Sequence, residues 1–427
     1  MIDIKLIREN SKLVKENIKK KFQTDKLVLV DTVKKLDDEW RKLKYQIDKL
    51  RASRNKVSEQ INKAKKAKEN IKPIIEKAKQ IPDKIKKIEE KASKLQEQIK
   101  EIMYKIPNII HKSVPSGKND TQNKEIKKIG KPNKFSFKVK SHVELGENLG
   151  ILDFDTSAKT SGNGFYYMKG ELAILNMALI NFARDFMIKQ NFEYVEPPLL
   201  IREEILNGVY SNTEIEQMAY KVDGEDLYLI ATSEHPLIGQ FIDTTLQKNK
   251  LPITQTAYSM CFRKEIGSHG IDEKGLFRTH QFNKVEMVVI CKPEESDKYF
   301  EKMKKISVDI LKGLGLPIRV LKICSGDLGD LKKEQVDIEV YSPRKKDYIE
   351  TGSCSNLTDC QARKLGITTR IKGERVVPHT LNNTALATPR PLVAILENNQ
   401  QKDGSVKIPR VLVPYMGGKT VIGKKNK

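Results

Sequence analysis

The chain has 427 residues, which is enough for a substantial core, and we expect two domains. Its 79 Lys and Arg against 56 Asp and Glu give a net charge of +23, which favours a polyanionic partner, although a Lys-rich proteome would produce the same excess. The five cysteines contain no CxxC pair, and no run of about 18 apolar residues is present, so a zinc knuckle, a disulfide framework and a membrane span are not expected. We expect a soluble cytoplasmic protein.

Apolar residues at alternating spacings of three and four occupy two runs near the start of the chain, residues 33–64 and 74–106. Such heptad spacing predicts coiled-coil helices, and two seams of similar length bury each other when the chain folds back on itself. We therefore expect an antiparallel helical hairpin over about residues 31–106. Because an interior proline kinks a helix, Pro82 predicts either a bend or a second helix that begins at Asp83.

More than half of the net charge lies on this part of the chain, because residues 1–110 carry 31 Lys and Arg against 17 Asp and Glu. A rigid basic rod suits recognition of a folded RNA through its backbone, so residues 1–106 are expected to form an RNA-binding arm. A solvated coiled coil used for dimerisation accounts for the periodicity at least as well. The candidate RNA contacts are basic residues of the first hairpin helix: Arg41, Arg51, Arg54, Lys56, Lys63 and Lys66.

A stretch without periodicity follows the hairpin. Residues 107–135 are rich in Pro, Gly, Asn and Lys, which is typical of a linker. Residues 136–427 are then expected to form a second domain of mixed helices and strands. Within it, a helix is predicted from Glu171 to about Gln190. The strand NFEYVEPPLLIREE comes next, and its paired prolines place it at a sheet edge or an interface, because proline donates no ladder hydrogen bond.

The segment DLYLIATSEHPLIG carries Thr232, Ser233 and Glu234 at the end of a predicted strand. Taken alone, the TSE triplet is more often a helix-capping box than a binding site.

The next informative segment is CFRKEIGSHGIDEKGLFRTHQFNKVEM, residues 261–287. It carries Arg263 and Arg278 around a Gly-rich turn and then Phe282, which together offer guanidinium forks for phosphates and an aromatic face for adenine. In the apolar strand that follows, the buried carboxylate of Glu286 would need a cation, such as the amino group of a substrate. The alternative is an ordinary hairpin with surface arginines.

Two further segments carry groups suited to a nucleotide. The strands DIEVYSP and KDYIETGSCSN predict a hairpin that presents Glu350 and Ser353, hard oxygen ligands suited to magnesium. In VPHTLNNTALATPRPLVAILENNQ, Thr388 and Pro391 mark a helix start, and Arg390 emerges there, an arrangement that favours anionic phosphate.

These segments resemble the three motifs of class II aminoacyl-tRNA synthetases, in the form found in seryl-tRNA synthetases of the type-2 or standard bacterial-archaeal kind. Motif 1 would lie at about 171–198, motif 2 at 261–287 and motif 3 at about 379–400, and PNIIHKSVPSGK resembles the segment that joins the two domains of that family. The resemblance implies an α+β fold, in which an N-terminal antiparallel coiled-coil hairpin precedes a class II synthetase domain, an antiparallel sheet flanked by helices.

The resemblance also implies an activity: an ATP-dependent ligase of protein biosynthesis that attaches serine to tRNA(Ser) through a seryl-adenylate, with tRNA(Sec) as a candidate second substrate. Expected partners are ATP, L-serine, tRNA(Ser) and a second copy of the chain, with Mg²⁺ accompanying ATP and no zinc. Two alternatives stay open: an amino acid:carrier-protein ligase, and a noncatalytic RNA-binding paralogue. The divergent zinc-dependent seryl enzyme lacks support, because no Cys/His/Glu ligand cluster is visible.

Site roles follow from the same resemblance. The catalytic residues would be Arg263 and Arg390, and the magnesium ligands Glu350 and Ser353. Lys264 and His269 stand at variable positions of motif 2. The serine-binding residues would be Thr232, Ser233, Glu234, Arg263, Glu286, Asn382 and Thr384. The ATP-binding residues would be Arg263, Lys264, Glu265, Arg278, Thr279, Phe282, Glu350, Thr351, Gly352, Ser353 and Arg390.

Overall fold

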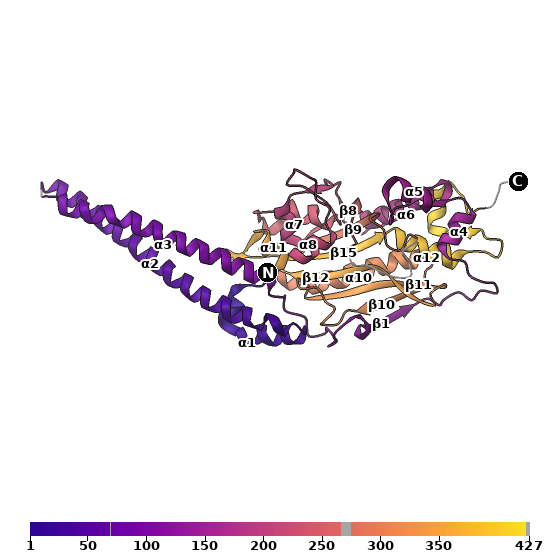
Figure 1. Ribbon diagram of the computed structural model, residues 1–427, viewed down its shortest axis with the longest axis horizontal. Helices are drawn as coiled ribbons and strands as arrows, with labels where there is room; N and C mark the ends of the chain where they lie inside the picture. Colours follow the sequence, from indigo (N-terminus) through magenta and orange to yellow (C-terminus); the bar gives the residue numbers. More distant parts are fainter. Residues whose placement is uncertain (69, 266–274, 424–427) are drawn as a thin grey trace. The chain divides into compact units, whose positions relative to one another are not determined.

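The computed structural model describes residues 1–68, 70–265 and 275–423 (Figure 1). The chain divides into two units, Met1–Pro107 and Asn108–Lys427. Within the described residues, no helix is both long enough and apolar enough to cross a membrane. The predicted α+β fold is confirmed, with long helices in the first unit and a largely antiparallel sheet in the second.

The first unit is helical, and its two long helices form the predicted antiparallel hairpin (Figure 1). Their seam buries Ile47 of one helix and Ile81, Ile85 and Ala92 of the other, as the heptad spacing requires. The second helix runs continuously through Pro82 and does not begin at Asp83, because buried residues on both sides of the proline hold it in the seam. The elements are α1 (Ile4–Lys20), η1 (Thr24–Lys26), α2 (Leu27–Lys66) and α3 (Lys72–Lys105).

An eight-stranded sheet forms the centre of the second unit, in the order β1-β10-β11-β12-β15-β9-β8-β4. All neighbouring strands are antiparallel except the β4·β8 pair. The strands are β1 (Lys124–Ile129), β4 (Glu193–Tyr194), β8 (Ile253–Phe262), β9 (Gln281–Cys291), β10 (Ile318–Lys322), β11 (Glu334–Ser342), β12 (Asp347–Thr358) and β15 (His379–Ala387).

Both edges of this sheet differ in detail from the sequence expectation. The strand predicted in NFEYVEPPLLIREE is divided into β4, at the sheet edge, and β5, in a separate sheet, because the two prolines between them cannot continue a ladder. At the other edge, the stretch 107–135 expected as a linker contains β1, and the side-chain amide of Asn108 donates to the carbonyls of Leu331 (3.0 Å) and Leu357 (3.1 Å). Lys-rich composition does not prevent pairing, since ladder bonds use the backbone.

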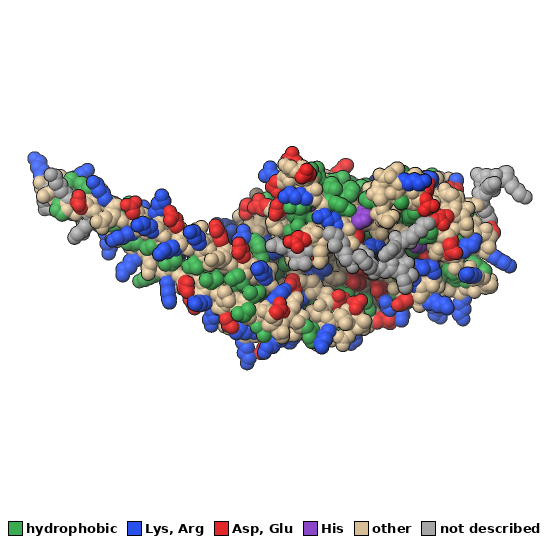
Figure 2. Space-filling view, viewed as in Figure 1, with side chains coloured by type: hydrophobic (Ala, Val, Ile, Leu, Met, Phe, Trp, Pro, Cys, Tyr) green, Lys and Arg blue, Asp and Glu red, His purple; other side chains and the backbone are tan. Residues whose placement is uncertain are grey.

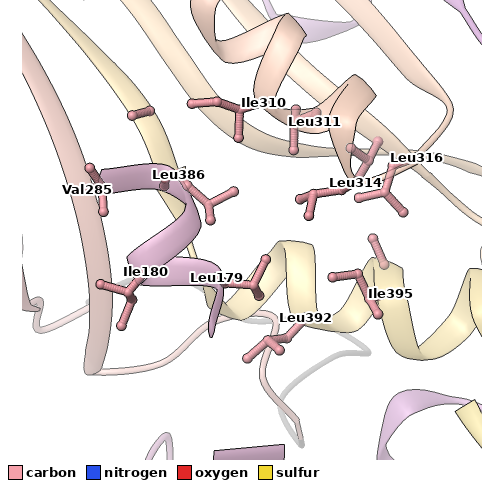
Figure 3. Packing of buried hydrophobic residues seen from close by; sticks show 14 of the residues in the cluster. Leu179, Ile180, Val285, Ile310, Leu311, Leu314, Leu316, Leu386, Leu392 and Ile395 are labelled. Atoms are coloured by element: carbon pink, nitrogen blue, oxygen red, sulfur yellow. The ribbon is translucent and has the colours of Figure 1, made fainter. Parts of the chain in front are cut away.

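Helices cover both faces of the sheet, and the alternation along β9 shows how. Val285, Met287 and Val289 belong to a large cluster with residues of α6, α10 and α12, whereas Val288 and Ile290 belong to a second cluster with residues of α7, α9 and α11. Figure 3 shows the first cluster, where the labelled side chains of these helices converge on the strands. Because side chains alternate along a strand, Glu286 lies on the same face of β9 as Val288 and Ile290.

The remaining elements surround this core. The helices are α4 (His142–Asn148), α5 (Phe154–Ser161), α6 (Gly170–Lys189), α7 (Glu203–Val209), α8 (Asn212–Met218), α9 (Glu234–Gly239), α10 (Ser296–Gly313), α11 (Cys360–Lys364) and α12 (Pro389–Asn399). The short strands are β2 (Leu152–Asp153), β3 (Tyr167–Met168), β5 (Leu200–Ile201), β6 (Tyr228–Leu229), β7 (Thr245–Leu246), β13 (Thr368–Ile371), β14 (Glu374–Val376), β16 (Val406–Lys407) and β17 (Val421–Ile422).

Candidate active site

A pocket in the second unit is lined by three segments that lie far apart in the sequence. Its empty volume is about 670 Å³, which includes solvent at its mouth. The lining residues are Arg263, Glu265, Phe277, Arg278, Thr279, Phe282, Lys284, Glu350, Thr351, Gly352, Ser353, Thr384, Ala387, Pro389 and Arg390. Every expected ATP-binding residue except Lys264 therefore lines one pocket; the backbone N–H of Lys264 donates to Met218.

Arg263 follows directly on β8, and its guanidinium lies 5.1 Å from the ring centroid of Phe282 on the neighbouring β9. Its Nε donates to the carbonyl of Ala231 (3.3 Å), and its backbone N–H donates to the carbonyl of His280 (2.9 Å). The guanidinium is thus fixed before any substrate binds. The turn residues Gly267 and Gly270, and His269 with them, lie outside the described residues.

Arg390 stands at the first turn of α12, and its guanidinium is held by strand β12 and by the segment that precedes β9. Its Nη1 donates to the carbonyl (2.9 Å) and the carboxylate (3.1 Å) of Glu350, and its Nε donates to the carbonyl of Phe277 (3.2 Å). The guanidinium also lies 4.8 Å from the centroid of the Phe277 ring, and Lys345 Nζ lies 4.1 Å from the same centroid. Sequence reasoning missed Phe277, which has no polar group to mark it.

Arg278 is the most exposed cation of the site, with 47% of its side chain accessible, and its Nη1 lies 3.4 Å from Glu265. Thr279 is buried, and its hydroxyl donates to the carbonyl of Gln281 (3.0 Å).

The β11–β12 hairpin presents oxygen atoms to the pocket, as predicted. Ser353 lies opposite Asp337 in the strand register, and Glu350 lies three residues before it. Burial, with a further contribution from the charge of Glu350, raises the pKa of Asp337 to about 8. Sequence reasoning missed Asp337, although it stands in the quoted strand DIEVYSP. Gly352 must remain small, since a Cβ there would lie 2.8 Å from Thr384.

The expected cation for Glu286 is supplied by the chain itself. Lys284 Nζ lies 2.5 Å from the carboxylate of Glu286 and donates to the hydroxyl of Thr232 (3.1 Å); all three side chains are buried. Burial raises the pKa of Glu286 above its usual value. Sequence reasoning missed Lys284, although residues two apart on a strand share a face.

Glu234 is buried beside this group. Its carboxylate accepts from the side-chain amides of Asn382 (2.6 Å) and Gln361 (2.7 Å). Burial and the charge of Glu286 raise the pKa of Glu234 to about 7. Ser233 precedes α9 and makes no side-chain capping bond, whereas the hydroxyl of Thr232 accepts the backbone N–H of Glu234 (3.3 Å), a helix-start contact of the kind that the capping alternative for TSE predicted.

Lys284 therefore connects the predicted serine-binding residues to the pocket, which it lines together with Arg263 and Thr384. Thr232, Ser233, Glu234, Glu286 and Asn382 do not line the pocket themselves, and all five are buried.

The six candidate RNA contacts are exposed on α2. Arg41 pairs with Asp37 and Asp38, and Arg51 pairs with Glu89. Among the residues described, no group of three or more His, Cys, Asp or Glu is placed to hold a metal ion.

Two family models match the sequence. The seryl-tRNA synthetase N-terminal domain matches residues 1–110, and the tRNA synthetase class II core domain (G, H, P, S and T) matches residues 218–399. Serine–tRNA ligases from Methanocella arvoryzae and Methanoregula boonei are each 46% identical, over 74% of this chain and 75% of theirs. The crystal structure of seryl-tRNA synthetase from Pyrococcus horikoshii complexed with ATP superposes with a TM-score of 0.93 at 41% identity, covering 100% of both chains. The cytoplasmic serine–tRNA ligase from Naegleria fowleri in complex with AMP gives 0.89 at 30% identity, covering 100% of this chain and 99% of that one.

Proposed function

The chain belongs to the seryl-tRNA synthetase family of class II aminoacyl-tRNA synthetases, and from this premise we infer how its pocket performs the reaction. The protein is a serine–tRNA ligase that uses ATP. A carboxylate oxygen of serine bonds to the α-phosphorus of ATP, the bond to the β-phosphate oxygen breaks, and pyrophosphate leaves. A terminal ribose hydroxyl of the tRNA then takes the seryl group, and AMP leaves. No nucleophile from the protein is required, so positioning and charge stabilisation provide the catalysis.

The observation that carries this proposal is the pocket in which Arg263, Phe282 and Arg390 converge. Arg263 would contact the α-phosphate and the serine carboxylate, because its half-buried guanidinium lines the pocket and is already bonded to the carbonyl of Ala231. Phe282 would offer its ring to adenine, with Glu265 and the backbone of Thr279 fixing the base. Arg278 and Arg390 would hold the distal phosphates. Arg390 must then exchange part of its bonding to Glu350 for phosphate oxygens.

The residues present fit a magnesium ion that accompanies ATP. Glu350 is 44% accessible at the pocket and Ser353 lines it too, and both offer the hard oxygens that magnesium prefers. We propose that Glu350 and Ser353 hold the ion, and that the buried carboxyl of Asp337 supports them. When bound, magnesium neutralises charge on the triphosphate.

Serine would be recognised by the buried polar group around Lys284. Glu234, Glu286, Asn382 and Thr384 would pair with the amino and hydroxyl groups of the substrate, while Lys284 limits the repulsion between the two carboxylates. Alanine would leave these polar groups unpaired, and a site of this kind discriminates by about 10⁴ or more.

We propose that the basic hairpin of the first unit binds the tRNA backbone. Lys and Arg side chains are spread along it (Figure 2), and all six candidate contacts are exposed. The same shape-based contact would serve tRNA(Ser) and tRNA(Sec), since it reads phosphates rather than bases. A cytoplasmic location is consistent with this role and with five free cysteines, because disulfides are rare in reducing compartments.

We also propose a homodimer. Motif 1 pairs subunits in class II synthetases, and α6 belongs to the corresponding segment of this chain. This helix leaves three apolar side chains exposed: Ile174 (50% accessible), Met177 (47%) and Ile188 (47%). Exposed apolar side chains gathered on one helix are typical of an interaction surface. Ile174→Asp should produce monomers in sedimentation analysis, and an unchanged dimer would contradict the assignment of α6 to the interface.

The function is tested by pyrophosphate exchange with ATP and each amino acid in turn, followed by transfer to tRNA with residues 31–106 present or deleted. Activation of serine alone, with charging lost only on deletion, is the expected result. Exchange without charging by the intact chain would favour the carrier-protein ligase, and absence of exchange would favour the noncatalytic paralogue.

A further inference from the structure

A buried histidine outside the pocket connects three segments of the second unit. His142, the first residue of α4, is 3% accessible, and its Nε2 accepts the backbone N–H of Leu276 (3.1 Å). Its Nδ1 lies 3.3 Å from the carboxylate of Glu397 on α12. Because Nε2 accepts a hydrogen bond, the neutral ring carries its proton on Nδ1 and donates it to Glu397.

Glu397 is itself completely buried and has further partners. The hydroxyl of Ser342 at the end of β11 donates to its second oxygen (2.5 Å), and Arg344 Nε lies 3.4 Å from the first. Burial would raise the pKa of Glu397, but the hydrogen bonds from His142 and Ser342 hold that pKa below its ordinary value. The carboxylate is therefore charged and fixed, and it holds the imidazole in one orientation.

The segment held by His142 is the end of motif 2 that returns to the pocket. Leu276 is buried and is followed by Phe277, whose carbonyl and ring both contact Arg390. Gly275 has a φ of 133°, and a Cβ there would lie 2.5 Å from His142 Nε2, so only glycine allows the ring this close.

Arg390 and Glu397 stand seven residues apart on α12, which is about two turns and about 10 Å along the helix. The return segment is thus attached to α12 at two points, directly through Arg390 and indirectly through His142 and Glu397. With only the first attachment, Phe277 could rotate with Arg390 as a unit. The second attachment fixes the backbone against which Arg390 is oriented.

We propose that His142 is a positioning residue for ATP: it holds residues 275–277 against α12 so that Phe277 keeps the Arg390 guanidinium directed at the pocket. This inference rests on the proposed function, in which Arg390 binds phosphate. A merely structural role would predict loss of stability with no selective effect on either substrate.

Two substitutions distinguish the roles of the two ring nitrogens of His142. His142→Gln places an amide oxygen near the Nε2 position, where it can accept the Leu276 N–H, whereas His142→Asn reaches only toward Glu397 and leaves that N–H unpaired. We expect His142→Asn to raise the KM for ATP about tenfold in pyrophosphate exchange, the effect of about one lost hydrogen bond, with the KM for serine changed less than about twofold. His142→Gln should stay within about threefold of the unmodified protein.

The matched control is His379→Asn. His379 lies in the same unit with its Nδ1 3.0 Å from the hydroxyl of Ser296, and it does not line the pocket. The substitution keeps the reach toward Ser296 but removes part of a partly buried ring, so it should lower the melting temperature at most slightly and should not separate the two KM values. Should His142→Asn fail to fold, Gly275→Ala displaces the ring instead and should give the same selective rise in the KM for ATP.

Equal KM values for ATP in both His142 variants and the unmodified protein would overturn the proposal, as would parallel changes in both KM values. Failure of the proposed function is distinguishable, because the unmodified protein would then show no serine-dependent exchange.

Discussion

Replacing Lys284 by Met tests the central electrostatic argument of the proposed serine pocket. The substitution keeps an unbranched side chain of similar length but removes the cation 2.5 Å from Glu286, whose side chain is only 1% accessible. Breaking a buried ion pair by removing one partner destabilises a fold by roughly 3–5 kcal/mol, because the other charge is left without compensation. We expect an unfolding free energy lower by about that amount at pH 8.

The cost should depend on pH in a defined direction. Burial already raises the pKa of Glu286 above its ordinary value of 4.5, and Lys284 opposes that rise, so the substitution moves the pKa further up. A carboxyl whose pKa is raised on folding contributes stability below its unfolded pKa and loses it as the pH rises through the folded one. The deficit of the variant should therefore be small near pH 5 and full at pH 8.

The assay is urea unfolding of both proteins at pH 5 and pH 8, at one protein concentration. The double variant Lys284→Met/Glu286→Leu provides the control, because replacing both partners by apolar groups removes the stranded charge and should recover most of the loss. A deficit below about 1 kcal/mol at pH 8, or one that does not shrink at pH 5, would refute the argument that this pair is a coupled buried charge.

Four further substitutions probe the proposed nucleotide side of the pocket. Arg390→Ala and Arg263→Ala should each lower the rate of adenylate formation by about two to three orders of magnitude, because each removes one preorganised charge donor. Near-normal pyrophosphate exchange in either variant would contradict the role of that arginine. The stability of Asp337→Asn should rise relative to that of the unmodified protein as the pH rises from about 4 to about 8. A carboxyl whose pKa is raised on folding loses its contribution to the unfolding free energy over that range. If urea unfolding gives the same free-energy difference between the two proteins at pH 5 and at pH 8, the raised pKa is contradicted. Glu350→Gln should raise the Mg²⁺ concentration needed for half-maximal exchange, since a charged hard oxygen ligand is lost, and an unchanged MgCl₂ titration would exclude Glu350 as a ligand.

Local patterns were sufficient to predict the long helices, whereas the antiparallel sheet was expected from the resemblance to class II synthetases. The heptad spacing in residues 33–64 and 74–106 specified two helices that must bury one seam, and the structure contains that hairpin. Pro82 shows the limit of such reasoning, because a local breaker is overridden when buried residues on both sides hold the helix in place.

Motif chemistry was likewise local. The segments around Arg263, Glu350 and Arg390 carried enough residue types in fixed order to suggest one nucleotide site, and the structure brings these three residues to one pocket. The type of each group and its place on a strand end or a helix start can be read from a few neighbours in the sequence.

The partners of these groups were decided only by the tertiary structure. Strand register places Asp337 opposite Ser353, and the packing of α12 brings Arg390 to Glu350, 40 residues away in the sequence. His142 and Glu397, separated by 255 residues, meet only because α4 packs against α12. The chain by itself determined which side chains can carry charge, stack or bend the backbone; which charges neutralise one another, and hence their pKa values, depended on distances that only the folded sheet and its helices set.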